Sequence, residues 1–322
     1  MKNIGLAMLA LAIAGCGAET PSSEQTAKTM FIIVDGIPAD VIESVATPNL
    51  DDIAGADGYT RAYVGGEAGG ESESPTVSAV GYNSLLTGTW ANKHNVYDND
   101  VENPNYEYWD IFRIAKNHDP SLQTAIYSTW TDNRTKLVGD GLAEAGGAKI
   151  DFAADGYELD EARFPHDEAR QYIKDIDQLV VDEASRHVRE AGPDLSWVYL
   201  ETTDDVSHEF GDSPEFTAAV ETLDVQLGQI WSAIQERQQQ HGEDWLLVIT
   251  TDHGRDPETG KDHGGQSERE RTTWIVTNSD RLNDSFGRMP GIVDILPSIT
   301  THMGIDIPDA VRAGLDGKSF ID

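Results

Sequence analysis

The chain has 322 residues, enough for one large α/β domain with a sizeable buried core, and we expect a single domain. It carries 23 Lys and Arg against 57 Asp and Glu, so its formal net charge is −34. The acidic residues are spread along the whole chain, which indicates a solvated acidic surface and argues against a nucleic-acid-binding face. Because this field repels anions, a phosphate site here would need strong local positive charge.

The N-terminus is predicted to be an export signal. Lys2 precedes a short apolar run, 4–14, which is too short to remain as a membrane-spanning helix. The run ends in Ile13-Ala14-Gly15-Cys16, which resembles the lipobox of bacterial lipoproteins. That resemblance implies removal of a signal peptide, 1–15, acylation of Cys16, and a lipid-anchored protein in the periplasm or at the cell surface. A plain secretory signal is the alternative.

Cys16 is the only cysteine, so intrachain disulfides are excluded and a thiolate metal site is disfavoured. Residues 16–28 are rich in Ser, Thr and Glu, which predicts a flexible tether. We therefore expect the folded domain to occupy residues 29–322.

The first predicted strand is the apolar run 29–34 (TMFIIV), whose continuity is typical of a strand buried on both faces of a parallel sheet. Asp35 follows at its carboxyl end, where open α/β sheets place their sites. It is therefore a candidate metal ligand. Short helices are predicted at 38–45 and 48–53.

A glycine-rich polar loop, 65–74, leads into a segment with helical spacing of apolar residues, 78–86. Ser78 stands at the start of this helix, where backbone N–H groups and the helix dipole stabilise an anion. We expect it to face a phosphoryl group, although a simple capping role for Thr76 or Ser78 is an equal alternative. The polar loop that follows carries Asn99.

The middle of the chain offers candidate substrate contacts. A basic patch follows the short predicted strand 124–127, so Arg134 and Lys136 could meet substrate; more often such residues pair with surface acids. Trp90 and Trp109 could stack on a planar leaving group, or could instead pack their loops against the core. Residues 139–156 are predicted to be mostly loop, and a long amphipathic helix follows at 167–191.

A further buried strand, 195–200 (LSWVYL), precedes Asp204 and His208. These two are four residues apart, so on a helical turn they share one face and can bind one ion. Asp205 is a possible substitute, but the spacing favours Asp204. A long helix is predicted at 214–240.

The strand 245–250 (WLLVIT) ends at Asp252 and His253, and His263 follows in a glycine-rich loop. Taken alone, this stretch could equally be a turn or a helix cap. Together with the acids at the other strand ends, its imidazoles suit zinc or a similar divalent ion. The chain closes with a strand at 272–277, a helix at 294–303 and a tail, 316–320, expected at the surface.

In this order the motifs resemble the alkaline phosphatase superfamily, above all its type I phosphodiesterase/nucleotide pyrophosphatase branch. The resemblance spans nearly all of residues 29–320 and rests on six motifs: Asp35-Gly, Leu-Leu-Thr87-Gly88, Asp98-Asn99, Asp204-x-x-x-His208, Asp252-His253-Gly and His263-Gly. It implies a three-layer α/β sandwich around a mostly parallel sheet, and two zinc ions. One ion would be held by Asp204, His208 and His263, the other by Asp35, Asp252 and His253, with Ser78 bridging toward it.

In the diesterase branch the nucleophile stands nine residues before the Thr of Thr-Gly, which implies Ser78 here. The Asn that binds a phosphoryl oxygen stands twelve residues after that Thr, which implies Asn99. The segment departs from the branch in its residue types, because a Thr followed by an aromatic and Pro-Asn is usual. The sulfatase pattern, Cys or Ser followed by x-Pro-x-Arg, is also absent from Ser78-Ala-Val-Gly-Tyr, which disfavours a sulfatase.

The resemblance implies a hydrolase of small phosphate esters that acts through a phosphoseryl intermediate, with diesters or pyrophosphates ahead of monoesters. An alkaline phosphomonoesterase is the main alternative, and a non-catalytic metal-binding lipoprotein would require a missing ligand. Charge supports the two-ion site, since two dications about 4 Å apart repel by roughly 17 kcal/mol at an effective dielectric of 20. Three Asp carboxylates and a Ser alkoxide would balance them.

Overall fold

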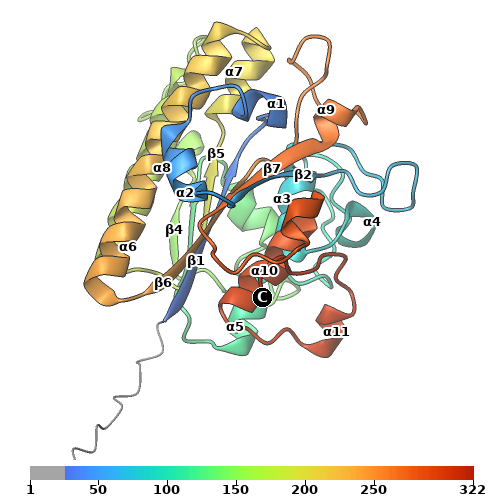
Figure 1. Cartoon of the computed structure of the whole chain (residues 1–322), viewed down its shortest axis with the longest axis vertical. Coiled ribbons are helices and arrows are strands. Elements are labelled where there is room, and N and C mark those ends of the chain that lie inside the picture. Colours follow the sequence, from blue (N-terminus) through green and yellow to red (C-terminus); the bar gives the residue numbers. More distant parts are fainter. Residues whose placement is uncertain (1–25) are drawn as a thin grey trace, which may run out of the picture.

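A computed structural model describes residues 26–322. Its centre is a seven-stranded sheet with the strand order β2-β7-β6-β1-β5-β3-β4 (Figure 1). β6, β1, β5, β3 and β4 run parallel, whereas β7 is antiparallel to both β6 and β2. The strands are β1 (Ala27–Val34), β2 (Tyr59–Tyr63), β3 (Thr124–Ser128), β4 (Phe152–Ala154), β5 (Leu195–Leu200), β6 (Asp244–Thr250) and β7 (Thr272–Thr277).

Helices cover both faces of the sheet, with α2, α6 and α8 on one side and α3, α5 and α10 on the other (Figure 1). This is the predicted mostly parallel α/β sandwich. The helices are α1 (Ala39–Ile42), α2 (Pro48–Ala54), α3 (Ser78–Thr87), α4 (Ala91–His94), α5 (Ile111–His118), α6 (Gln171–Glu190), α7 (Thr202–Phe210), α8 (Pro214–His241), α9 (Glu268–Arg271), α10 (Ile295–His302) and α11 (Asp309–Arg312). Within the described residues, no helix combines the length and apolarity needed to cross a membrane.

Side-chain alternation along β1 explains its unbroken apolar run. Met30 and Ile32 join the core beneath α6 and α8, while Phe31 and Ile33 join the core beneath α3 and α10. Successive side chains point to opposite faces of a strand, so a strand covered on both faces must be apolar throughout. Phe31 also stacks on Trp197 of the neighbouring β5, with ring centroids 5.8 Å apart.

The buried strands match their predictions closely, and β5 and β7 have the predicted ends. β1 begins earlier than predicted, at Ala27, so the predicted tether 16–28 overlaps the strand. The reason is that Lys28 is buried, with its ammonium 2.6 Å from Asp194. The predicted signal peptide and Cys16 lie outside the described residues.

Three features differ from the sequence predictions. β2 was not predicted, because its alternating exposed and buried residues (YTRAY) lack a long apolar run. β4 lies within the predicted loop 139–156. The tail is at the surface only in part, since Lys318 is exposed but Phe320 is fully buried, with its ring centroid 5.3 Å from that of Phe286.

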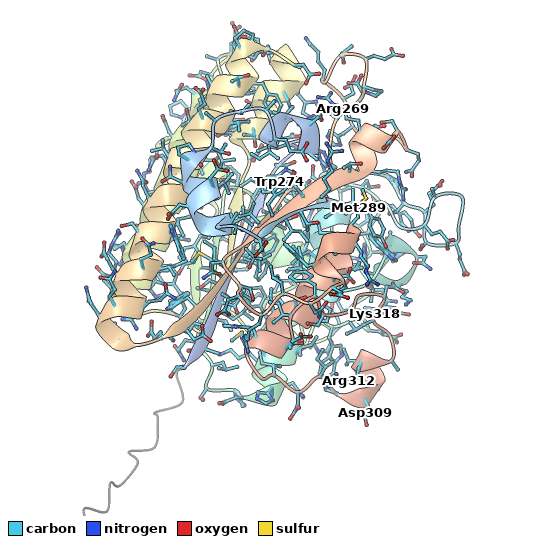
Figure 2. The ribbon with its side chains drawn as sticks, viewed as in Figure 1. Arg269, Trp274, Met289, Asp309, Arg312 and Lys318 are labelled. Carbon is cyan, nitrogen blue, oxygen red and sulfur yellow. The ribbon has the colours of Figure 1, made fainter. Side chains whose placement is uncertain are left out.

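The sheet also anchors the loop that follows β1. Trp274, labelled on β7 in Figure 2, is buried in the core that includes α1 and α2. Its indole N–H donates to the carbonyl of Ile37 at 3.0 Å. The backbone beyond Asp35 is thereby tied to the neighbouring strands.

Candidate metal centre and active site

The candidate site lies where the adjacent strands β1, β5 and β6 end. Asp35 follows β1, Asp252 and His253 follow β6, and α7 begins directly after β5. Asp177 of α6 fixes the start of α7, because its carboxylate accepts from the backbone N–H groups of Glu201 at 3.1 Å and Thr202 at 2.8 Å. The α7 side chains are therefore held against the other strand ends.

Two buried tyrosines orient Asp35. Its Oδ2 accepts a hydrogen bond from Tyr199 at 2.7 Å and another from Tyr82. Its Oδ1 is buried without a hydrogen-bond partner and lies 3.3 Å from Nε2 of His253. Burial and the negative charge of Asp35 raise the pKa values of both tyrosines well above their ordinary range, so they remain donors.

Asp252 is arranged in the same way. Its Oδ1 accepts from the backbone N–H of Gly36 at 3.1 Å. Its Oδ2 is buried without a hydrogen-bond partner, 3.2 Å from Nε2 of His253. The Nδ1 of His253 lies 2.9 Å from the carbonyl of Gly254, which assigns its proton to that bond and directs Nε2 toward the two carboxylates.

These donors fit a divalent cation. Two unpartnered carboxylate oxygens and one imidazole nitrogen converge on the same point, where their lone pairs repel unless a proton or a metal ion lies between them. Burial alone would lower the pKa of His253, but Asp252 and Asp35 outweigh it and raise the pKa to about 9. Burial and Asp35 raise the pKa of Asp252 as well. We call Asp35, Asp252 and His253 the His253 site.

A second group of donors adjoins it. Nε2 of His208 lies 3.3 Å from Oδ2 of Asp204 and 3.2 Å from Nε2 of His263. Nε2 of His263 is itself 3.8 Å from the other Asp204 oxygen, Oδ1. The Nδ1 of His263 is 2.9 Å from the carbonyl of Thr76, so its Nε2 also offers a lone pair. Burial and nearby His253 lower the pKa of His263 to about 3, which keeps the ring neutral. We call Asp204, His208 and His263 the His208 site.

The two sites share one cleft. Asp204 Oδ1 is 4.0 Å from His253 Nε2, and the rings of His253 and His263 stack at 3.8 Å between centroids. The structure thus brings all six residues named from the sequence as ligands into two adjacent clusters. His253 of one site and His263 of the other are in van der Waals contact. Ions held at the two sites would therefore be close enough to contact the same substrate.

Ser78 and Asn99 face the same centre. Ser78 is the first residue of α3, and its Oγ lies 3.2 Å from Nε2 of His253. The Oδ1 of Asn99 accepts from the backbone N–H of Ala79 at 3.0 Å, which leaves its amide N–H groups available to a ligand. Both residues line a cavity of about 310 Å³ together with Asp35, Tyr82, Asp100, Trp130, Asp132, Lys136, Tyr199, Glu201 and Asp204.

Three of the four substrate contacts predicted from sequence lie elsewhere. Trp90 is buried against Tyr63, with ring centroids 5.5 Å apart. Trp109 packs on the core and carries the Arg113 guanidinium 4.2 Å from its ring centroid. Arg134 makes a bidentate ion pair with Asp155, at 2.7 and 3.1 Å. These three side chains are engaged in packing and pairing, whereas the fourth candidate, Lys136, lines the cavity together with Trp130.

Arg255 is a site residue that sequence reasoning missed. It is fully buried and donates to the carboxylate of Asp204. Burial disfavours the ionised form of Asp204, but Arg255 and His208 outweigh this and hold the pKa of that carboxyl well below its usual range. Its position directly after Asp252-His253-Gly254 was the available signal. Tyr82 had a signal too, because it stands four residues after Ser78 and so shares its helix face.

With this geometry established, comparison with known proteins decides the family. The sequence profile of the type I phosphodiesterase/nucleotide pyrophosphatase family matches residues 29–297. The chain belongs to this family. Curated relatives include a phosphopentomutase of Lachnoclostridium phytofermentans, 28% identical over 218 residues, which cover 67% of this chain and 48% of the relative. A 2,3-bisphosphoglycerate-independent phosphoglycerate mutase of Rhodopseudomonas palustris is 30% identical over 145 residues, covering 44% and 26% of the two chains.

Solved structures share the fold of this phosphodiesterase-family chain. A phosphonate monoester hydrolase of Agrobacterium radiobacter superposes with a TM-score of 0.64 at 15% identity, covering 91% of this chain and 76% of its own. A 2-O GAG sulfatase superposes with a TM-score of 0.65 at 13% identity, covering 92% and 73%. The phosphodiesterase-family chain spans about half or less of the length of the curated relatives described above.

Proposed function

We propose that this protein is a two-zinc hydrolase of phosphate esters that forms a phosphoseryl intermediate on Ser78 and prefers diesters or pyrophosphates. One observation carries the proposal: the Ser78 hydroxyl, at the N-terminus of α3, lies 3.2 Å from the imidazole nitrogen toward which the unpartnered oxygens of Asp35 and Asp252 also point. A nucleophile, a set of metal ligands and a helix N-terminus thus meet at one point.

The chain's own groups have separate tasks in this reaction. Ser78 Oγ attacks phosphorus and displaces the alcohol or phosphate leaving group. Water then cleaves the phosphoseryl ester, which releases the second product and restores the serine hydroxyl. The Asn99 amide, held by its bond to the Ala79 N–H, donates to a nonbridging oxygen as charge develops there. Divalent ions at the two sites would lower the pKa of the Ser78 hydroxyl and stabilise the leaving oxygen. Tyr82 and Tyr199 keep Asp35 oriented throughout.

The charge of the cavity favours a diester over a monoester. Of the described residues that line it, Lys136 is the only cation, and its ammonium is 2.8 Å from Asp132. Burial and nearby carboxylates raise the pKa of Glu201 well above its usual range, so this residue adds little negative charge. A monoester dianion carries one more negative charge than a diester, and the lining offers no unpaired cation to balance it.

The test compares turnover of bis-(p-nitrophenyl) phosphate and p-nitrophenyl phosphate by the same zinc-loaded preparation. We expect the diester to have the higher kcat/KM. A higher value for the monoester would favour an alkaline phosphomonoesterase, and no turnover of either would overturn the proposal.

The nucleophile is tested with Ser78→Ala. We expect zinc content close to that of the wild type with turnover lost, because six other ligands remain while the covalent step is removed. Ser84→Ala is the matched control, since Ser84 is buried on the same helix and bonds to His94, away from the cavity. Full activity of Ser78→Ala would assign the nucleophile to Thr76 or to water.

We also propose that the enzyme is exported and anchored through Cys16, on the lipobox alone. Residues 17–26 separate Cys16 from the first strand, a length of chain that spans at most about 36 Å. The domain would therefore lie close to the membrane. Fractionation of cells that express Cys16→Ser tests this, because a membrane-bound variant would contradict a lipid anchor at that residue.

A further inference from the structure

Arg255 is the one guanidinium buried among the residues of the two candidate metal sites, as far as the described chain goes. Its side chain is fully buried and does not line the cavity beside Ser78. It therefore cannot touch a substrate held there. Arg255 can therefore affect the reaction only through the residues that accept its hydrogen bonds.

The Arg255 guanidinium is held in position by backbone carbonyl groups, independently of the side chains of the metal ligands. Its Nε donates to the carbonyl of Gly36 at 3.1 Å, Nη1 to that of Lys261 at 3.2 Å, and Nη2 to that of Asp204 at 3.1 Å. Gly36 has a left-handed backbone (φ +68°), and a Cβ there would collide with the guanidinium. Backbone acceptors from two loops and from α7, with a glycine that makes room, fix the cation in place.

In this position Arg255 also donates to two side chains of the His208 site. Nη2 bonds Oδ1 of Asp204, and Nη1 lies 3.4 Å from Nε2 of His208. Both atoms carry lone pairs that a metal ion at this site could use, and Oδ2 of Asp204, 3.3 Å from His208, is the carboxylate oxygen that Arg255 leaves available. A neighbouring fixed positive charge also repels a dication, and burial keeps water from screening that repulsion.

The His253 site has no such fixed cation beside it in the described part of the chain. Oδ1 of Asp35 and Oδ2 of Asp252 have no hydrogen-bond partner, while their other oxygens accept from the neutral donors Tyr82, Tyr199 and Gly36. Neutral outer donors usually orient metal ligands and raise metal affinity. The two sites are thus supported in opposite ways, one by neutral donors and one by a cation.

We propose that Arg255 is a built-in competitor for the His208 site, so that this site binds its zinc ion more weakly than the His253 site and fills second. The inference rests on the metal-binding part of the proposed function and makes Arg255 a positioning residue. Occupancy of the second ion, and with it turnover, would then follow zinc concentration while the first ion stays bound.

The test measures zinc affinity at pH 9, close to the pKa of His253, where the proton on that ring costs little affinity. It uses competition with a chromophoric chelator, without substrate. For the wild type we expect two classes of ion whose dissociation constants differ about ten-fold or more, the weaker class being lost in His208→Ala. Equal affinities, or loss of the weaker class in His253→Ala, would overturn the proposal. Failure to bind any zinc would overturn the proposed function as well.

Arg255→Met then gives the direction of the effect. Loss of an ordinary orienting partner weakens metal binding about 10- to 100-fold, whereas loss of a competitor strengthens it. We expect the weaker class to tighten about ten-fold and the tighter class to stay unchanged. Lys261→Met is the matched control, because it removes a nearby exposed charge that bonds the Glu209 carbonyl and not Asp204. Weaker zinc binding in Arg255→Met would refute competition. If this variant does not fold, the two zinc dissociation constants of the wild type, assigned with His208→Ala and His253→Ala, still test the proposal.

Discussion

Zinc should have to displace a proton from His253, and this can be measured. In the metal-free protein the pKa of His253 is about 9, because Asp252 and Asp35 outweigh the effect of burial. At pH 7 the ring is then about 99% protonated. Nε2 is the nitrogen that faces Asp35, Asp252 and Ser78, so the proton lies where a metal ion would bind.

The size of the effect follows from the pKa. Between pH 7 and 9, binding of an ion at the His253 site should release at least the His253 proton and gain affinity about ten-fold or more per pH unit. Asp252, whose pKa is also raised, adds to the count where it is protonated. At pH 7 the displaced proton costs about 3 kcal/mol of apparent binding free energy, at about 1.36 kcal/mol per pH unit. His263 should release none, since its pKa of about 3 keeps it neutral.

Isothermal titration calorimetry tests this with zinc added to metal-free Ser78→Ala, in two buffers of the same pH and different ionisation enthalpy. The variant removes the serine hydroxyl, whose own proton would add to the count. We expect the binding enthalpy to shift between buffers by the amount for at least one proton. The same enthalpy in both buffers at pH 7 would refute the raised pKa.

The same proton contributes to the free energy of unfolding of the metal-free protein. The pKa of His253 is raised above its ordinary 6.5, so its contribution is fully present below pH 6.5 and is lost as pH rises through 9. At about 1.36 kcal/mol per pH unit this amounts to roughly 3 kcal/mol. Urea unfolding in chelator should show that loss, and zinc should remove most of the pH dependence between these values.

Three other predictions concern the surroundings of the site. Tyr82→Phe should weaken zinc at the His253 site about ten-fold or more, because Asp35 loses a donor; Tyr97→Phe, at an exposed position, is the control, and equal affinities would contradict the role. Trp130→Ala should raise KM for diesters with aromatic leaving groups, at about 1–3 kcal/mol per stacking contact, and leave a dialkyl phosphate unaffected, whereas Trp109→Ala should change neither. The kcat/KM for an anionic diester should rise with salt to moderate ionic strength, and a steady fall would show that local attraction outweighs the charge of −34.

The central strands and the ligands at their ends were predictable from sequence for one physical reason. A strand covered by helices on both faces is an uninterrupted apolar run, so β1, β5 and β6 stand out, and the polar residues that follow mark their carboxyl ends. Asp35, Asp252 and His253 follow directly from this rule. β2 and β4 lie at the edges of the sheet and are short, so they leave no comparable run.

The residues that orient the ligands could not be identified from the sequence in the same way. Tyr199 lies in the middle of a strand whose pattern indicates only burial, yet its hydroxyl bonds Asp35. Arg255 follows the Asp-His-Gly motif, where a charged residue suggests a solvated loop. Its burial depends on carbonyls from Gly36 and Lys261, which the fold brings together from distant parts of the chain.

Arg134 and Lys136 show why the sequence could not decide between neighbouring candidate substrate contacts. Both lie on one π-helical turn, Asn133–Leu137, and side chains two apart on a helical turn face different ways. The sequence therefore allows either residue to face the cavity, but not both. What decides between them is Asp155, which follows β4 and pairs with Arg134. Because β4 is too short to be predicted, the partner of Arg134 was hidden, and the side chain left to line the cavity was Lys136.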